Sequence, residues 1–132
     1  MKSRHIKILT AATLLILAPQ IAFAHAHLVE ANPAEKALIQ EKPTQVVIKF
    51  SEELEPSLSK IEVKELTTGK VVSANKTETT GDGRDTLQVA LNSIGESKGK
   101  FQVNWKVVSK DSHKMKGSYE FTVGTKTDEK VK

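Results

Sequence analysis

Two short motifs, far apart in the sequence, combine residue types that can bind a metal ion. His25 and His27 lie near the start of the chain, and Asp111 and His113 lie near its end. In extended backbone, residues i and i+2 point to the same face, so each motif would present its two side chains together. The chain contains four histidines, and these three are the ones that follow residue 24. A simpler interpretation competes with a metal site, because 111–113 could be only a polar turn between two strands.

Residues 1–24 have the composition of a secretory signal peptide. Three basic residues up to Lys7 precede an apolar stretch over 8–18, and the Ala-Phe-Ala sequence at 22–24 is a small-x-small cleavage site. Cleavage there would make His25 the first residue of the mature protein. Its free α-amine and its imidazole Nδ1 could then close one chelate ring on a metal, which no internal histidine can do. Signal cleavage also exposes arbitrary residues, so the chelate is a hypothesis that depends on the second motif.

Length and charge restrict the class of protein. Removing 24 of the 132 residues leaves one compact domain, predicted over 25–123, and a flexible charged tail over 124–132. Three of the 20 basic residues and none of the 16 acidic residues lie in 1–24, which leaves 17 against 16 and a mature net charge of +1. A charge this small excludes a nucleic-acid-binding surface. We expect the mature domain to be a monomer.

Cysteine usage and hydropathy restrict the chemistry and the compartment. The sequence contains no cysteine, which excludes thiolate metal sites, redox disulfides and cysteine nucleophiles. No apolar segment after residue 24 approaches the length needed to span a membrane. We therefore predict a soluble protein that is exported to the periplasm through its cleaved signal peptide.

The mature sequence is typical of an all-β protein. Apolar and polar residues alternate with a period of two, which is the pattern of strands with one buried face. The predicted strands are 45–50, 60–66, 86–91, 100–108 and 117–123. Turns rich in glycine, proline and asparagine separate them, and this spacing predicts a two-sheet sandwich or a small Greek-key barrel.

Three connecting segments have weaker patterns. Residues 33–42 have a helix-compatible composition and are predicted to form a turn of helix before Pro43. Residues 52–59 are polar and contain Pro56, so we predict a loop. Residues 75–85 are predicted to be a long polar connection.

The donor types in the two motifs favour Cu(II). Amine, imidazole and carboxylate groups are nitrogen and oxygen donors, and a nearly planar set of them suits Cu(II), which also heads the divalent affinity series. Zinc prefers a tetrahedron, and Cu(I) prefers sulfur, for which the mature chain offers only Met115. If an edge strand at the amino terminus lies near the turn at 111–113, the amine, two or three imidazoles and one carboxylate would converge.

On these motifs the sequence resembles the CopC/PcoC family of periplasmic copper-binding proteins, over nearly the whole mature chain. The resemblance implies an immunoglobulin-like (cupredoxin-like) Greek-key β-sandwich or barrel of about seven strands. The matching segments are His25-Ala26-His27-Leu28, Asn32-Pro33-Ala34, Val47-Ile48-Lys49-Phe50-Ser51, Asn104-Trp105-Lys106-Val107-Val108-Ser109, Asp111-Ser112-His113 and Gly117-Ser118-Tyr119-Glu120-Phe121-Thr122-Val123.

The resemblance also implies a site and a role. It places one Cu(II) per chain on the His25 amine and imidazole, Asp111 and His113, in a protein for copper trafficking, homeostasis or resistance that hands copper to a partner such as a CopD-type inner-membrane transporter. Family members with a second, Cu(I) site carry a methionine-rich loop, whereas here Met115 is alone, which implies the Cu(II)-only type. His27 could orient a ligand, replace one, or face solvent.

Two other functions are compatible with the motifs. Secreted copper monooxygenases also use an amino-terminal histidine chelate, but they need a broad surface for polysaccharide. All five aromatic residues of the mature chain are predicted to point inward, so we do not expect an enzyme: Phe50, Phe101, Trp105, Tyr119 and Phe121. The second alternative is a metal-free interaction module, because this fold class hosts many functions.

Overall fold

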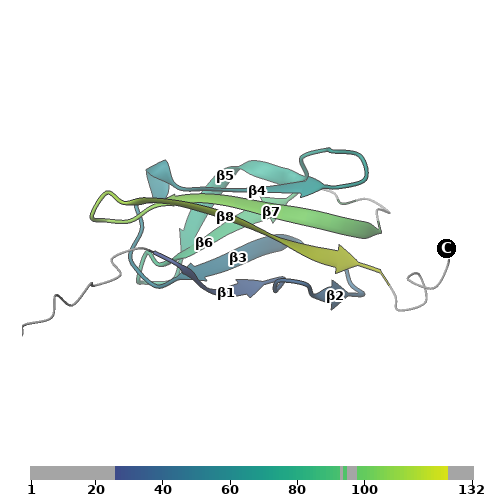
Figure 1. Ribbon diagram of the computed structural model, residues 1–132, viewed down its shortest axis with the longest axis horizontal. Coiled ribbons are helices and arrows are strands. Elements are labelled where there is room, and N and C mark those ends of the chain that lie inside the picture. Colours follow the sequence, from purple (N-terminus) through teal and green to yellow (C-terminus); the bar gives the residue numbers. More distant parts are fainter. Residues whose placement is uncertain (1–25, 93, 95–97, 125–132) are drawn as a thin grey trace, which may run out of the picture.

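Two four-stranded β-sheets pack face to face in this protein (Figure 1). The structure is a computed structural model that describes residues 26–92, 94 and 98–124. The predicted signal peptide, His25 and residues 125–132 of the predicted tail therefore lie outside the described residues. The elements in chain order are β1 (Leu28–Asn32), β2 (Leu38–Ile39), β3 (Gln45–Phe50), the 3₁₀ turn η1 (Pro56–Leu58), β4 (Lys60–Glu65), β5 (Ser73–Thr80), β6 (Thr86–Leu91), β7 (Gly99–Val108) and β8 (Lys114–Val123).

The sheet topology confirms the predicted all-β Greek-key sandwich. One sheet has the strand order β1-β3-β6-β5, and the other has the order β2-β8-β7-β4. Neighbouring strands are antiparallel, except that β2 runs parallel to β8. About seven strands were expected, and the described residues form eight, of which β2 has only two residues. No helix among the described residues is long and apolar enough to cross a membrane.

Period-two alternation located the main strands well. The bounds of β3 and β6 are the predicted ones, and β4 and β7 differ from prediction by one residue at one end. β8 begins three residues earlier than predicted, at Lys114, because its pairing with β7 continues to Val108 opposite Lys114. The connection between β7 and β8 is therefore short, because the two strands remain paired up to its two ends.

The core fills the space between the sheets. Phe50 of β3 packs edge to face against Trp105 of β7, with ring centroids 5.2 Å apart. Phe101 and Phe121 stack at 5.4 Å on neighbouring strands of the second sheet. Each of the five aromatic residues predicted to point inward is buried, and Trp105 is the most exposed of them at 9%. The aromatic side chains are therefore part of the core rather than of a binding surface.

The turn of helix predicted over 33–42 is wrong. This segment contains a turn and then β2, and Lys36 has a left-handed φ of 61°. One backbone hydrogen bond, from Ala37 N to Ala34 O, closes the turn, but the segment also bonds to β8: Lys36 N donates to Glu120 O at 2.7 Å and Thr122 N donates to Ala37 O at 2.8 Å. Helix-compatible composition is a weak signal, and pairing with a long neighbouring strand overrides it here.

The polar connection predicted over 75–85 is also partly wrong, because β5 extends to Thr80. β5 is an edge strand, so its side chains do not alternate between core and solvent in the way that the other strands do. Its hydroxyl groups accept hydrogen bonds from the backbone of β4 across the sheet boundary: Val63 N donates to Ser73 Oγ, and Ile61 N donates to Thr77 Oγ1, both at 3.0 Å. The predicted loop over 52–59 is confirmed apart from the short turn η1.

Candidate metal centre

The connection between β7 and β8 closes into a tight backbone turn. Ser109 N donates to His113 O at 2.9 Å, and Ser112 N donates to Ser109 O at 2.8 Å. Ser112 has a φ of 73°, a left-handed conformation that is uncommon for a residue other than glycine. These contacts close the chain reversal, so residues 110–113 lie at the tip of the β7–β8 hairpin.

Asp111 and His113 lie side by side on this turn. Asp111 Oδ2 is 2.9 Å from His113 Nδ1, and both side chains are about half exposed. The i, i+2 spacing predicted this proximity, although the backbone between the two residues is a turn rather than a strand. A neutral imidazole that donates from Nδ1 carries its lone pair on Nε2, and a carboxylate on the opposite nitrogen is a common way to orient a metal-binding histidine.

The buried residue Ser109 is hydrogen-bonded to both members of this pair, and its role was not predicted from the sequence. Its side chain is fully buried, its hydroxyl donates to Asp111 Oδ1, and it accepts a hydrogen bond from His113 N at 3.2 Å. The hydroxyl of Ser109, and next the side chain of His113, hold the pKa of Asp111 below its ordinary value. The carboxylate is therefore ionised at neutral pH. A serine two residues before an Asp-x-His motif is the signal that could have identified it.

The segment that follows residue 25 is bound to the end of β3. Ala26 is fully buried. His27 N donates to Ser51 Oγ at 3.1 Å, and Ser51 N donates to His27 O at 2.9 Å. β1 is the edge strand of its sheet, as expected, but it begins at Leu28, so exposed His27 precedes the strand rather than lying on its face.

One loop, residues 51–55, connects this segment to the β7–β8 turn. Leu54 forms a β-bridge with Ser109, and Lys110 N donates to Glu53 O at 2.9 Å. The Lys110 ammonium also pairs with the Glu53 carboxylate at 2.9 Å and lowers its pKa. Ser51, at the other end of the same loop, bonds to His27. The start of β1 and the β7–β8 connection consequently lie at the same end of the sandwich (Figure 1).

The described part of the site offers two metal donors. Across residues 26–92, 94 and 98–124, no three side chains of the His, Cys, Asp and Glu types gather into a group that could hold a metal. Asp111 and His113 together supply one carboxylate and one imidazole, which suit a nitrogen- and oxygen-binding metal but fill only part of its coordination sphere. The predicted chelating residue His25 lies outside the described residues, directly before Ala26.

The fold and this turn define a small β-sandwich domain with a carboxylate–imidazole pair at one end. A CopC domain model matches residues 28–124, and the chain belongs to this family. The copper transport protein CutJ of Bacillus subtilis (strain 168) is 32% identical over 110 residues, which cover 83% of this chain and 20% of that protein. Copper resistance protein C of Xanthomonas campestris pv. juglandis is 34% identical over 114 residues, covering 81% of this chain and 86% of that protein.

Solved structures agree with the family assignment. The crystal structure of CopC from Methylosinus trichosporium OB3b superposes with a TM-score of 0.68 at 31% identity, covering 75% of this chain and 93% of that one. PcoC, a methionine-rich copper resistance protein from Escherichia coli, gives a TM-score of 0.65 at 24% identity, covering 76% and 100%. The second likeness concerns the fold alone.

Proposed function

We propose that this protein binds one Cu(II) ion as cargo in the periplasm and passes it to a partner, without catalysing a reaction. The ligands in this proposal are the amine and imidazole of His25, freed by removal of 1–24, together with Asp111 and His113. One observation carries it. The β7–β8 turn that carries the Asp111–His113 pair and the segment directly after residue 25 are both bonded to one loop, residues 51–55.

The donor set supports copper in the oxidised state. An amine, imidazoles and a carboxylate are nitrogen and oxygen donors, which favour Cu(II) in the divalent affinity series. The ionised Asp111 carboxylate would offset part of the charge of the ion. The sequence holds no cysteine, and Met115 is its only methionine after residue 24, so soft donors for Cu(I) are scarce.

The relatives support a role in copper handling. One is named a copper transport protein and another a copper resistance protein, and this chain covers only 20% of the length of the first. In that relative a similar domain is part of a much longer protein. We therefore propose that this domain acts beside a transport partner, such as a CopD-type membrane protein, rather than alone.

The copper-enzyme alternative has less support. A polysaccharide-oxidising enzyme needs an exposed aromatic platform near its metal, and the five aromatic residues after residue 24 are all buried. A test for oxidation of polysaccharides by the copper-loaded protein separates the two functions, and we expect no product. Copper titration alone distinguishes the proposed function from a metal-free interaction module.

The decisive experiment compares two forms of the protein that differ only at the amino terminus. One begins at His25, and the other keeps Ala24 in front of it, so that the amine of His25 is part of a peptide bond. We expect the first form to bind one Cu(II) with a nitrogen-dominated electron paramagnetic resonance spectrum, and the second to bind far more weakly. Equal affinity in the two forms would contradict the chelate.

A further inference from the structure

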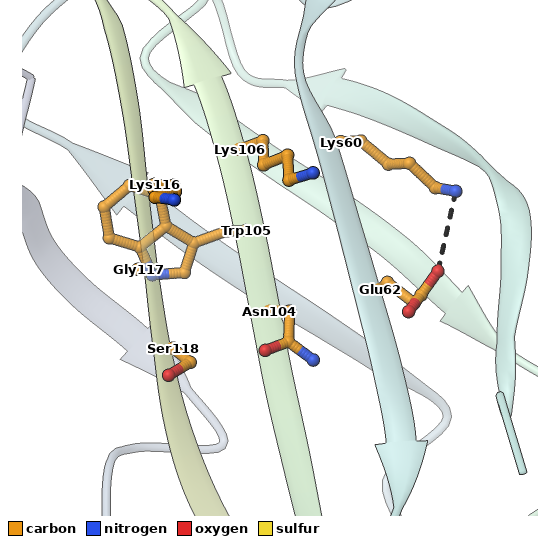
Figure 2. Close-up of a pocket in the computed structure, with 8 residues that line it drawn as sticks. All are labelled: Lys60, Glu62, Asn104, Trp105, Lys106, Lys116, Gly117 and Ser118. Carbon is orange, nitrogen blue, oxygen red and sulfur yellow. Dashed lines mark ion pairs between the residues drawn. The ribbon is translucent and has the colours of Figure 1, made fainter. Parts of the chain in front are cut away.

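Three lysines form a row across the outer face of the second sheet. Lys60 of β4 is the register partner of Lys106 of β7, and Lys106 is the partner of Lys116 of β8. All three side chains are exposed. Figure 2 shows them at one level on three neighbouring strands, with Glu62 below Lys60 and Trp105 packed beside Gly117.

This row opposes the stability of the sheet. Like charges directly opposite one another on neighbouring strands are destabilising. Lys60 has a partner in Glu62, at 3.7 Å, but within the described residues no carboxylate forms an ion pair with Lys106 or Lys116. Lysines on edge strands protect a sheet from aggregation, which accounts for Lys60 on β4. It does not account for Lys106, because β7 lies between β4 and β8.

The row continues toward the proposed copper site. Lys114 directly follows His113, and Lys116 is three residues from it, about 10 Å along an extended strand. Lys106, Lys114 and Lys116 line a hollow together with Leu58 and Met115. Leu58 is 64% exposed, the highest value among the exposed large apolar residues in the described part of the chain. We call Leu58, Lys60, Lys106, Lys114 and Lys116 the lysine face.

We infer that the lysine face is a docking surface for an acidic segment of a protein partner. If the partner is also the protein that exchanges copper with this one, the inference rests on the proposed function. Carboxylates of the partner would lie between the lysine ammonium groups, and one apolar side chain would cover Leu58. Complementary charge of this kind mainly raises the rate of encounter and fixes the orientation of the complex. A partner seated here would lie next to Asp111 and His113.

A protein segment fits this surface better than an anionic membrane. Peripheral membrane binding needs a continuous apolar face that enters the lipid, and the lysine face exposes one large apolar residue, Leu58. Glu62 lies two residues along β4 from the lysine row and is 3.7 Å from Lys60. A fixed negative charge there weakens attraction to a uniformly anionic surface, whereas an acidic segment can place its carboxylates beside the lysines and away from Glu62.

The inference is tested by nuclear magnetic resonance titration of the protein with a synthetic peptide of Asp and Glu residues around a central Leu. We expect amide shifts confined to the η1–β4 junction and the facing parts of β7 and β8. The double variant Lys106→Glu/Lys116→Glu should weaken peptide binding by about ten-fold or more. The matched control is Lys49→Glu/Lys70→Glu, which changes the net charge equally on β3 and on the β4–β5 connection and should leave binding within about two-fold.

The remaining outcomes also decide the question. Equal weakening in both double variants, or no peptide binding by the parent protein, overturns the inference, as does binding to phosphatidylglycerol vesicles without binding to the peptide. The neutral variant Lys106→Gln keeps the test valid if the charge reversals do not fold. Copper titration of the same variants should match the parent. If the parent binds the peptide but no copper, the docking surface stands and the proposed copper function fails.

Discussion

Asp111 Oδ2 lies 2.9 Å from Nδ1 of His113, while the opposite oxygen of the same carboxylate accepts a hydrogen bond from the buried Ser109 hydroxyl. The carboxylate is therefore held from both sides, by a core residue and by the imidazole that it orients. This arrangement makes the three residues separable by experiment, because each would contribute differently to a bound metal.

Substitution of the ligands should produce a ranked loss of Cu(II) affinity. His113→Ala removes a nitrogen donor, so its effect should exceed the ~10–100-fold loss typical of residues that only orient a ligand. Asp111→Asn keeps the shape but removes the charge, and should cost about 10–100-fold. His27→Ala should matter least, because His27 is not among the proposed ligands. Titration followed by electron paramagnetic resonance measures all three. A loss in His27→Ala as large as that in His113→Ala would contradict the ligand assignment.

The same three variants should fold normally without copper. Each changed side chain is exposed, and such substitutions usually alter stability by less than about 0.5 kcal/mol, or roughly 2–4 °C in Tm for a domain of this size. Thermal unfolding of the metal-free proteins checks this. A much larger drop in Tm would mean that the pair is structural, which would remove the main support for a cargo site.

Ser109→Ala should weaken copper binding through Asp111 and should change the titration of that carboxylate. Without the hydroxyl, the pKa of Asp111 should rise toward its ordinary value, because the Ser109 hydrogen bond is the first cause of its depression. Ser118→Ala, on the exposed part of β8, is the matched control and should change neither quantity. Carbon-13 detected titration of the Asp111 carboxylate gives a readout that simple loss of stability does not produce. An unchanged pKa in Ser109→Ala would show that Ser109 does not act through Asp111.

Copper affinity should fall as the pH is lowered from 8 to 5, an interval that includes the ordinary pKa values of imidazole, about 6.5, and of an α-amine, about 7.7–8. Protons compete with the metal for these nitrogen donors, so binding weakens as pH falls. Asp111 does not contribute in this range, because the hydrogen bond from Ser109 lowers its pKa below the ordinary value and the carboxylate stays ionised throughout. Isothermal titration at several pH values measures the slope, and a flat affinity would indicate a site without nitrogen donors.

Lys106→Gln should stabilise the metal-free protein slightly, because it removes the central charge of the lysine row. Cross-strand like-charge pairs cost up to about 1 kcal/mol, so we expect a gain within that range that shrinks at high salt. Denaturant unfolding at low and high ionic strength measures it. Lys49→Gln, on the other sheet, is the control. A loss of stability in Lys106→Gln would show that the lysine has a structural partner and would weaken the argument for docking.

The strands that bury one face were predictable, and the elements that depend on distant partners were not. β3, β6 and β7 alternate strictly because every second side chain enters the core. β2 and β5 have no such pattern, since β2 is two residues bonded to β8 and β5 is an edge strand whose hydroxyls bond to β4. Their structure follows from contacts with residues remote in the sequence, which local composition does not encode.

The candidate site likewise has one part that was predictable from the sequence and one part that was not. Asp111 and His113 are two residues apart, so their proximity follows from local geometry, and the structure places them in contact. Ser109 was missed because its role depends on its buried position and on the turn that brings Asp111 back over it, although it also forms a bridge to Leu54, far away in the chain. The common loop that bonds both to His27 and to the β7–β8 turn is likewise a property of the folded sandwich.

Gly117→Ala tests the packing beneath the lysine face. A Cβ atom at position 117 would overlap with Cζ2 of Trp105, a side chain that also packs against Phe50 of the other sheet. The ring cannot move without disturbing that contact, so we expect a loss of about 1–3 kcal/mol, which is typical of overpacked cores. Thermal unfolding measures the loss, and the fluorescence of Trp105, the only tryptophan, reports its displacement.

Two controls separate overpacking from the general effect of replacing glycine. At Gly83 a Cβ atom would make only ordinary contact, 3.5 Å from Asp85 Oδ1, so Gly83→Ala should be nearly neutral. Trp105→Phe removes the ring atoms that the new Cβ would meet, and Gly117→Ala should then cost less in that background than in the parent, giving a favourable coupling of roughly 0.5–3 kcal/mol. Additive losses in the double variant would show that the cost at position 117 comes from the backbone of β8 and not from its contact with Trp105.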